Sequence, residues 1–230
     1  MMVSIVLGLL LCAAESDYYV VDTIPSPKGE VIEVGGLDML PDGSLAVSTR
    51  RGRVWIIENP AAENPEDATW HLFADGLAEG LGLKVVDGEI YVVQRTELSR
   101  LRDDDGDRKV DHIDTLTQDW GLTNNYHEYA FGLPVDDDGN FYVSLNLAFI
   151  NPEWWHGQSQ QPWRGWVLRI SPEGEVTPMA HGFRSPCGVG MNVEGDVFVT
   201  ENQGDWMPVC PIYHVKDGGF YGHPNSLRWT

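Results

Sequence analysis

The feature that most constrains the fold is a unit that recurs four times along the chain. Each copy has a glycine, an apolar stretch, a tight turn ending in Asp-Gly or Glu-Gly, and then an apolar strand. The copies are GLDMLPDGSLAVST (36–49), GLKVVDGEIYVV (82–93), FGLPVDDDGNFYVS (131–144) and GVGMNVEGDVFVT (188–200). Their turn glycines are 45, 51 and 56 residues apart. Spacings of this size are typical of propeller blades.

Each unit predicts a β-hairpin, because glycine supplies the positive φ of a tight turn and the flanking runs are β-branched and aromatic. A third strand follows each unit, in RVWIIE, ELSRLR, WVLRIS and IYHVKD. A fourth follows the first three, in WHLFADGL, HIDTLTQ and EVTPMAHGF. No helical periodicity competes after residue 15. The sequence therefore predicts an all-β propeller of four-stranded antiparallel blades, and its self-similarity favours this over a β-sandwich.

We expect one propeller domain over 15–230, with blades near 36–77, 82–118, 129–183 and 187–230. Three complete blades and most of a fourth are predicted. The last segment, NSLRWT, offers no closing strand. An open arc would leave a sheet edge unpaired and a blade face exposed. We therefore expect the chain to be the N-terminal part of a longer propeller.

The charge and the N-terminus restrict location and partners. The formal net charge of −20 argues against nucleic acid, because phosphate contacts need a basic face. Residues 3–14, VSIVLGLLLCAA, are too few to span a membrane but fit a signal peptide that ends at Ala14. We expect a signal peptide at 1–14 and a secreted or periplasmic protein; the alternative is an ordinary first strand. Cys187 and Cys210 would then form a disulfide or remain unrelated buried thiols.

Three features predict a site at one mouth of the propeller channel. His127 directly precedes the inner strand of the third blade, where an imidazole can act as a general base. Arg184 holds the matching position one blade later, where a guanidinium can bind a planar anionic ligand. The turn at 201–205, ENQGD, is rich in the oxygen ligands that calcium takes. Each feature also has a purely structural explanation, as a loop histidine, a loop-tying arginine or an ordinary polar turn.

An acidic loop in the second blade has the alternating spacing of a calcium-binding loop. The carboxylates are Asp103, Asp105, Asp107 and Asp111. The match to an EF-hand is partial, since Arg108 takes the glycine position and no distal glutamate follows. Clustered carboxylates repel one another unless they are neutralised, so a structural calcium and a solvated acidic turn both remain open.

An insertion at 147–166 in the third blade is rich in tryptophan and glutamine. Its residues Trp154, Trp155 and Trp163 could stack on a sugar over the channel, or could pack the insertion against the blade. The chain contains no CxxCH motif, so it attaches no c-type haem.

The strings NYHEYAFGLPVDDDGNFYVS, GFRSPCGVGMNVEGDVFVTENQG and HVKDGGFYGHPN resemble segments of the soluble quinoprotein glucose/sorbosone dehydrogenases. They are even more similar to a group of secreted bacterial propellers of this type. The similarity runs from about residue 36 to the end. It implies a six-bladed propeller, pyrroloquinoline quinone (PQQ) and calcium as cofactors, a sugar or alcohol substrate, and an external electron acceptor such as a cytochrome.

The resemblance also implies roles for single residues. His127 matches the base that removes the substrate hydroxyl proton, and Arg184 matches the arginine beside PQQ. There, arginine and calcium stabilise the negative charge that grows on the cofactor oxygen. Gln203 and Gly204 match the turn that contacts the cofactor and its calcium.

The chain departs from the family pattern at three places. Ser185 stands where the family usually has asparagine, and Cys187 replaces a polar residue. Asp205 stands where a backbone carbonyl donor is expected. The basic residues that hold the cofactor in later blades would lie beyond Thr230. Two other functions stay open: a lactonase-like propeller whose calcium is bound by Glu201 and Asn202, and a binding module without catalysis.

Overall fold

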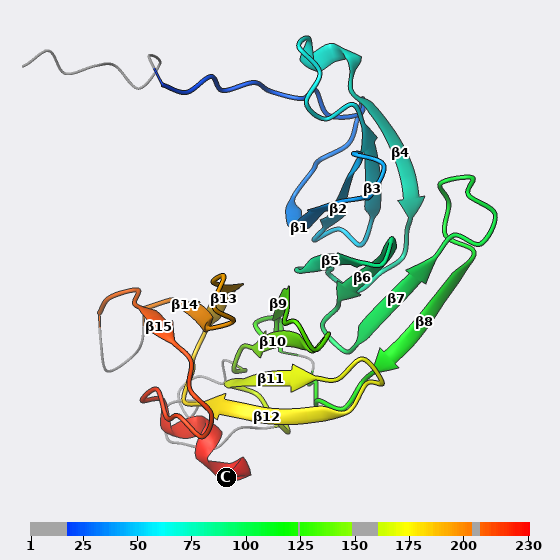
Figure 1. Cartoon of the computed structure of the whole chain (residues 1–230). Coiled ribbons are helices and arrows are strands. Elements are labelled where there is room, and N and C mark those ends of the chain that lie inside the picture. Colours follow the sequence, from blue (N-terminus) through cyan, green and yellow to red (C-terminus); the bar gives the residue numbers. More distant parts are fainter. Residues whose placement is uncertain (1–17, 124, 149–160, 204–207) are drawn as a thin grey trace, which may run out of the picture.

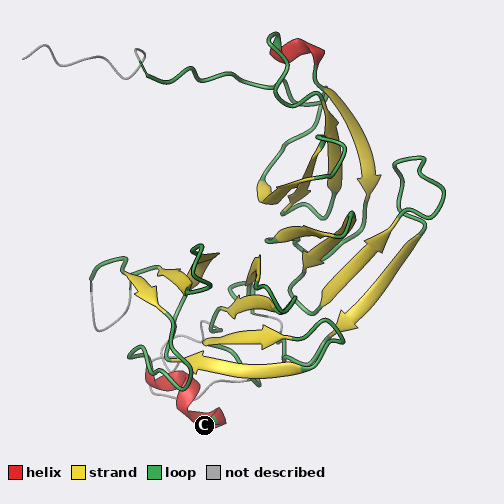
Figure 2. Cartoon of the chain, viewed as in Figure 1, coloured by secondary structure: helices red, strands yellow, loops and turns green. Residues whose placement is uncertain are grey.

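The computed structural model describes residues 18–123, 125–148, 161–203 and 208–230. Within these ranges the chain is almost entirely strand, turn and loop, with two short 3-10 helices, η2 (Pro65–Asp67) and η4 (Pro224–Trp229) (Figure 2). No helix in the described ranges is both long and apolar enough to cross a membrane. The predicted signal peptide, 1–14, lies outside the described residues.

The strands form four antiparallel sheets arranged in an arc (Figure 1). The first sheet contains β1 (Val34–Met39), β2 (Leu45–Thr49), β3 (Val54–Glu58) and β4 (Thr69–Ala74). The second contains β5 (Leu83–Val86), β6 (Glu89–Val93), β7 (Leu98–Arg102) and β8 (His112–Thr117). The third contains β9 (Ala130–Val135), β10 (Phe141–Leu145), β11 (Trp166–Ile170) and β12 (Val176–His181). The fourth contains β13 (Pro186–Met191), β14 (Val197–Glu201) and β15 (Ile212–His214).

The predicted propeller is confirmed. Each sheet is a simple meander in chain order, and each repeat forms the hairpin of its first two strands. The third and fourth strands also fall where the sequence places them. The four sheets stand side by side around the arc as blades, so the β-sandwich alternative is wrong.

The first strand of each blade lies on the inside of the arc, where β1 packs on β5, β5 on β9 and β9 on β13. This packing explains the glycine that opens the repeats. A Cβ on Gly36 would lie 2.3 Å from the backbone nitrogen of Leu83. A Cβ on Gly82 would lie 2.3 Å from the carbonyl oxygen of Gly132. Only glycine allows neighbouring inner strands to approach this closely.

The core lies between consecutive blades. Ile56 and Phe73 of the first blade pack with Ile90 and Leu101 of the second. A second cluster joins the second and third blades, and a third cluster joins the third and fourth. The third blade is covered on both faces by its neighbours, with Phe141 and Val143 in one apolar cluster and Tyr142 in the next. Its strand FYVSL at 141–145 is therefore buried along its whole length rather than on alternate residues.

Antiparallel connectivity gives the blades two different ends along the direction of their strands. The turns of the β1–β2, β5–β6, β9–β10 and β13–β14 hairpins lie at one end. The loops that enter the inner strands, including 121–129 and 182–185, lie at the opposite end. The acidic loop at 103–111 joins β7 to β8 and therefore belongs to the hairpin-turn end.

Candidate functional site

His127 lies in the loop 121–129 that leads into β9. Its Nδ1 is 3.0 Å from the carbonyl oxygen of Leu147, which follows β10. A carbonyl only accepts, so this contact places the ring proton on Nδ1 and leaves Nε2 as the basic nitrogen. Burial lowers the pKa of His127, and the positive charge of Arg184 lowers it further. The imidazole is therefore neutral near pH 7 and able to accept a proton.

A buried arginine fixes both ends of this loop. The Arg164 side chain donates from Nε to the Gly121 carbonyl at 2.7 Å and from Nη1 to the Tyr129 carbonyl at 2.9 Å. Its Nη2 donates to the Arg95 carbonyl in the second blade at 3.2 Å. Arg164 is only 1% exposed, and burial lowers its pKa to about 10, which leaves it charged at neutral pH. The bonds join the loop to two blades.

Two more charged residues complete this support. Arg95 donates to the carbonyl oxygens of Asn125 and Glu128. The Glu128 carboxylate is fully buried and accepts bonds from the backbone nitrogen and hydroxyl of Thr123. Its negative charge also favours the buried Arg164 cation. No local spacing in the sequence marks Arg95 and Arg164, because their partners are backbone carbonyls at least 30 residues away. Nothing in the sequence marks Glu128 as buried.

Arg184 lies in the loop 182–185, between β12 and β13. Its Nη1 donates to the carbonyl oxygen of Gln203 at 2.8 Å and to Ser185 Oγ at 3.4 Å. Glu201, the last residue of β14, is 2% exposed and holds the loop backbone. It accepts bonds from the backbone nitrogens of Arg184 and Ser185, both at 2.7 Å. Burial raises the pKa of Glu201 against the opposing effect of these donors.

The two loops meet at Ser185, whose Oγ lies 3.3 Å from His127 Nε2. The structure therefore brings His127, Arg184 and Gln203 into one hydrogen-bonded cluster. The cluster lies among the entry loops, on the side of the blades opposite the hairpin turns. Their catalytic and cofactor-binding roles remain predictions. Gly204, Asp205, Trp154 and Trp155 lie outside the described residues.

The residues that follow the second strand of the first three blades join the entry loop of the next blade. Arg50, after β2, lies 3.5 Å from Glu79 of the second blade. Arg95, after β6, binds the loop of the third blade, as described above. Leu147 donates its backbone N–H to the Arg184 carbonyl of the fourth blade at 2.9 Å. This repeated contact sets the entry loops in a fixed relation around the channel mouth.

The glycine-rich segment near the C-terminus supports the loop of Arg184 from outside. The backbone N–H of Tyr221 donates to the His181 carbonyl, and that of His223 donates to the Gly182 carbonyl, both at 2.8 Å. The Tyr221 ring also stacks on Phe183, with ring centroids 4.8 Å apart. This segment, part of the string HVKDGGFYGHPN, therefore holds the loop of Arg184 in place.

Two further predictions concern the insertion and the cysteines. Trp163, the one predicted stacking tryptophan in the described ranges, packs edge-on against Trp166 at 5.4 Å between ring centroids. This contact favours the packing explanation for that indole. Cys187 and Cys210 are free thiols and exposed, so neither the disulfide nor the buried-thiol expectation describes them.

The acidic loop gathers part of the predicted calcium set. Carboxylate oxygens of Asp103, Asp105 and Asp111 all lie within 4.8 Å of one another. Asp107 stands outside this group, and its Oδ1 accepts a bond from the Lys109 backbone nitrogen at 2.9 Å. The structure therefore brings three of the four carboxylates to one place.

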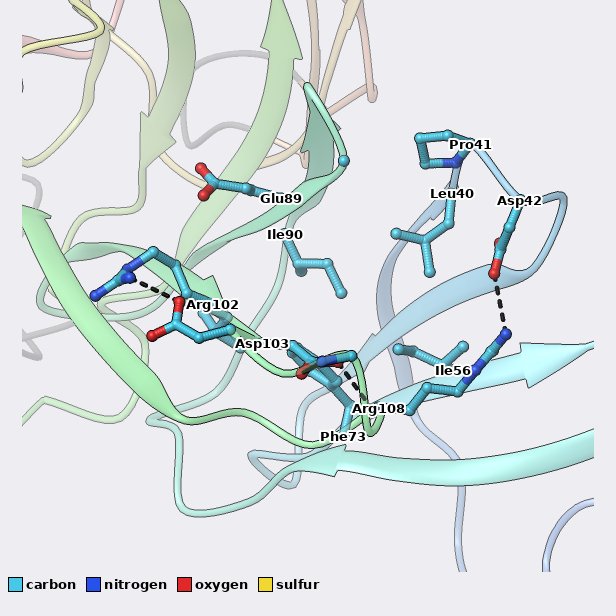
Figure 3. A pocket seen from close by; sticks show the side chains of 14 residues that line it. Leu40, Pro41, Asp42, Ile56, Phe73, Glu89, Ile90, Arg102, Asp103 and Arg108 are labelled. Carbon is cyan, nitrogen blue, oxygen red and sulfur yellow. Dashed lines mark hydrogen bonds and ion pairs between the residues drawn. The ribbon is translucent and has the colours of Figure 1, made fainter.

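Arg108, at the glycine position of that loop, adopts a left-handed φ of 64°. Its guanidinium reaches the first blade, with Nη2 3.0 Å from Asp42 and 3.2 Å from Glu58. Beside it, a pocket of about 430 Å³ opens between the first two blades at the hairpin-turn end (Figure 3). The apolar side chains that line the pocket are those of Leu40, Ile56, Phe73, Ile90 and Leu101. It is thus separate from the His127 cluster.

The donor set around Arg184 fits an anionic quinone better than a calcium ion. A guanidinium fixed by two bonds suits carboxylate or ring oxygens, and the neutral His127 suits a proton-accepting role. The Gln203 carbonyl, however, already accepts a bond from Arg184. The positive charge of the Arg184 guanidinium would repel a calcium ion at that oxygen.

The fold defines a β-propeller, and the entry-loop cluster is a candidate site at one channel mouth. The chain belongs to the family described as a domain of unknown function (DUF7133), which matches residues 15–223. A search of curated proteins found no match.

Solved structures share the fold at low sequence identity. The PQQ-bound aldose sugar dehydrogenase of Streptomyces coelicolor is 18% identical, with a TM-score of 0.66 over 90% of this chain and 66% of that one. A presumed oxidoreductase (glucose dehydrogenase) of Thermus thermophilus is 21% identical, with a TM-score of 0.65 over 84% of this chain and 66% of that one. A presumed gluconolactonase is 14% identical, with a TM-score of 0.54 over 82% of this chain and 67% of that one.

The chain spans about two thirds of the length of these three structures. The resemblance to soluble quinoprotein sugar dehydrogenases is confirmed as a likeness of fold. At these identities it does not by itself assign an activity.

Proposed function

We propose that this chain is part of an exported, PQQ-dependent sugar or alcohol dehydrogenase. The observation that carries the proposal is the hydrogen-bonded cluster that joins a neutral imidazole, His127, to a fixed guanidinium, Arg184, at the channel mouth. The shared fold with sugar dehydrogenases supports it. Neither residue alone would distinguish this function from a structural role.

His127 would take the proton from the substrate hydroxyl at Nε2. Its Nδ1–H donates to the Leu147 carbonyl, so the imidazolium that forms keeps a bound acceptor on the other nitrogen. Bound PQQ would supply the acceptor for the hydride that leaves the substrate carbon, with an external electron carrier such as a cytochrome as the final acceptor. Arg184, with the Gln203–Gly204 turn, would hold the anionic cofactor beside the base.

The lactonase alternative finds less support in the geometry. It needs Glu201 as a calcium ligand, but both carboxylate oxygens of Glu201 bind backbone N–H groups of the Arg184 loop. The same burial that raises the pKa of Glu201 also keeps it away from the channel surface. A binding propeller without catalysis is the outcome that remains if the quinone does not bind.

The test is a calorimetric titration of the full-length protein with PQQ, followed by dye reduction with aldoses and alcohols. Replacing His127→Gln should lower turnover by about 10²–10⁴ and leave quinone affinity nearly unchanged. Replacing Arg184→Ala should weaken quinone binding. His112→Gln, in exposed β8, is the matched control. No heat of binding with wild-type protein would reject the dehydrogenase proposal.

Export is part of the same proposal. The apolar run that ends at Ala14 predicts cleavage there, so the mature protein should begin at Glu15. N-terminal sequencing of protein from the culture medium or periplasm measures this directly. Protein that stays in the cytoplasm with Met1 intact would contradict it.

A further inference from the structure

The hydroxyl of Ser185 lies between the two groups that the proposed function depends on. Its Oγ is 3.4 Å from Arg184 Nη1 and 3.3 Å from His127 Nε2. A guanidinium can only donate, so Ser185 Oγ accepts from Arg184. The hydroxyl hydrogen is then available to Nε2, the nitrogen left unprotonated by the Leu147 contact. The hydrogen bonds therefore have one direction, from Arg184 through Ser185 and His127 to Leu147.

The backbone holds Ser185 in this position. Its N–H donates to Glu201 Oε1 at 2.7 Å, and its carbonyl accepts from the Asn202 backbone nitrogen at 3.2 Å. Ser185 is only 2% exposed. A side chain buried to this degree offers a substrate almost no surface, so its hydroxyl acts through His127 rather than on the substrate.

The charged and titratable groups near the imidazole in the described residues come from two entry loops. Arg184 comes from the entry loop of the fourth blade. Tyr126 and Tyr129, from the loop of His127 itself, have ring centroids 6.0 and 5.9 Å away. The neighbouring Glu128 directs its carboxylate to Thr123. The Ser185 hydroxyl, by contrast, contacts Nε2 directly.

We propose that Ser185 is a positioning residue for His127, with a hydroxyl that holds the ring by Nε2 and connects it to Arg184. The contact to Nε2 is long for a hydrogen bond to a hydroxyl, so a substrate hydroxyl can compete for the same lone pair. The catalytic consequence rests on the proposed dehydrogenase function, but the geometry does not.

The proposal makes a measurable statement about the imidazole. A donor to Nε2 stabilises the neutral ring, so loss of the hydroxyl should raise the pKa of His127. The expected rise in Ser185→Ala is about half a unit to one unit. Ser185→Thr keeps a hydroxyl at the same carbon and should restore the wild-type value.

The experiment is nuclear magnetic resonance of the full chain with ¹⁵N-labelled histidine, without any quinone. Wild-type His127 should show the Nδ1–H tautomer, a measurement that needs no variant. The imidazole resonances of the exposed His112 should have the same positions in all three proteins at one fixed pH, as the control for an intact fold. An Nε2–H tautomer in the wild type, or an unchanged His127 titration in Ser185→Ala, would overturn the proposal.

The activity measurement separates this proposal from the function on which it rests. In quinone-loaded Ser185→Ala, the acid limb of the kcat/KM profile should move to higher pH by the same amount as the rise in the pKa of His127 measured by resonance. An enzyme that turns over with an unmoved acid limb would reject the role of Ser185. A protein with the expected resonance shift but no quinone binding would reject the dehydrogenase function and leave the positioning role intact.

Discussion

Burial shifts the pKa values of His127 and Glu201 in opposite directions, because it penalises the charged form of each. For His127 the penalised form is the imidazolium, so the folded pKa is below the usual value of 6.5. For Glu201 it is the carboxylate, which is kept in place by the N–H groups of the Arg184 loop. The site therefore combines an imidazole, His127, that is neutral near pH 7 with a carboxyl group, Glu201, whose position is set by backbone hydrogen bonds.

The lowered pKa of His127 predicts a pH-dependent stability. The stabilising contribution of the neutral ring is present above about pH 6.5, the unfolded value, and is lost as the pH falls through the folded value. The difference in unfolding free energy between wild type and His127→Gln should therefore shrink between about pH 7 and pH 5. Urea denaturation at several pH values measures it. A difference that stays constant over that range would contradict the prediction.

Only part of this site can be predicted from the sequence. His127 and Arg184 are identifiable because each precedes an inner strand whose glycine and hairpin turn are visible in the repeat. Arg164 and the loop-holding role of Glu201 are not, because their partners are backbone groups brought close only by folding. A buried arginine that binds carbonyls leaves no periodic trace in the sequence.

At the scale of the elements, the repeat is more informative than any single strand. The four hairpins are set by turn glycines such as Gly43, with a φ of 85°, and by the apolar runs beside them. The fourth blade ends at its short third strand, β15, and among the described residues no fourth strand pairs with it. Hairpins depend on contacts close in sequence, so they can be predicted, whereas the placement of 208–230 depends on blade three.

The close approach of inner strands predicts a large effect at Gly82. A Cβ there would meet the backbone of Gly132 and the Val93 side chain at once, so no flexible group can move aside. Gly82→Ala should destabilise the fold by about 1–3 kcal/mol or more. Gly190→Ala, where a Cβ meets nothing within 4 Å, is the matched control. Thermal unfolding compares them, and equal melting temperatures would show that the inner strands separate freely.

The acidic loop predicts a calcium-dependent element, because Asp103, Asp105 and Asp111 place oxygens together while Asp107 does not. Wild-type protein should melt higher in calcium than in chelator, since a ligand of the folded state stabilises it by mass action. Asp105→Ala should lose this difference, and Asp107→Ala should keep more of it. Scanning calorimetry in both buffers measures it. Equal shifts for wild type and Asp105→Ala would leave the loop as a solvated turn.

For the whole molecule, the main contacts between blades join each blade to the next along the arc. Three apolar clusters lie between consecutive blades, and the entry loops bind forward from one blade to the next. In such an arrangement stability is the sum of local terms, as in other repeat proteins. The site at Ser185 then depends most on the third and fourth blades, which supply His127 and Arg184.

This sequential arrangement predicts that damage to one interface stays near it. Phe73→Ala, in the cluster between the first two blades, should cost about 3–5 kcal/mol and speed amide exchange mainly in β1–β8. Val199→Ala, between the third and fourth blades, should speed exchange mainly in β9–β15, including the loop of Arg184.

Hydrogen exchange followed by mass spectrometry, below the melting temperature of both variants, measures these patterns peptide by peptide. The loop 121–129 provides the sharpest comparison, because Arg164 and Arg95 fix it to both the second and the third blade. It should respond to both variants, but more weakly than the damaged interface itself. A uniform increase over all four sheets in either variant would mean that the arc unfolds as one cooperative unit. The site would then draw its stability from all four blades rather than from the two that form it.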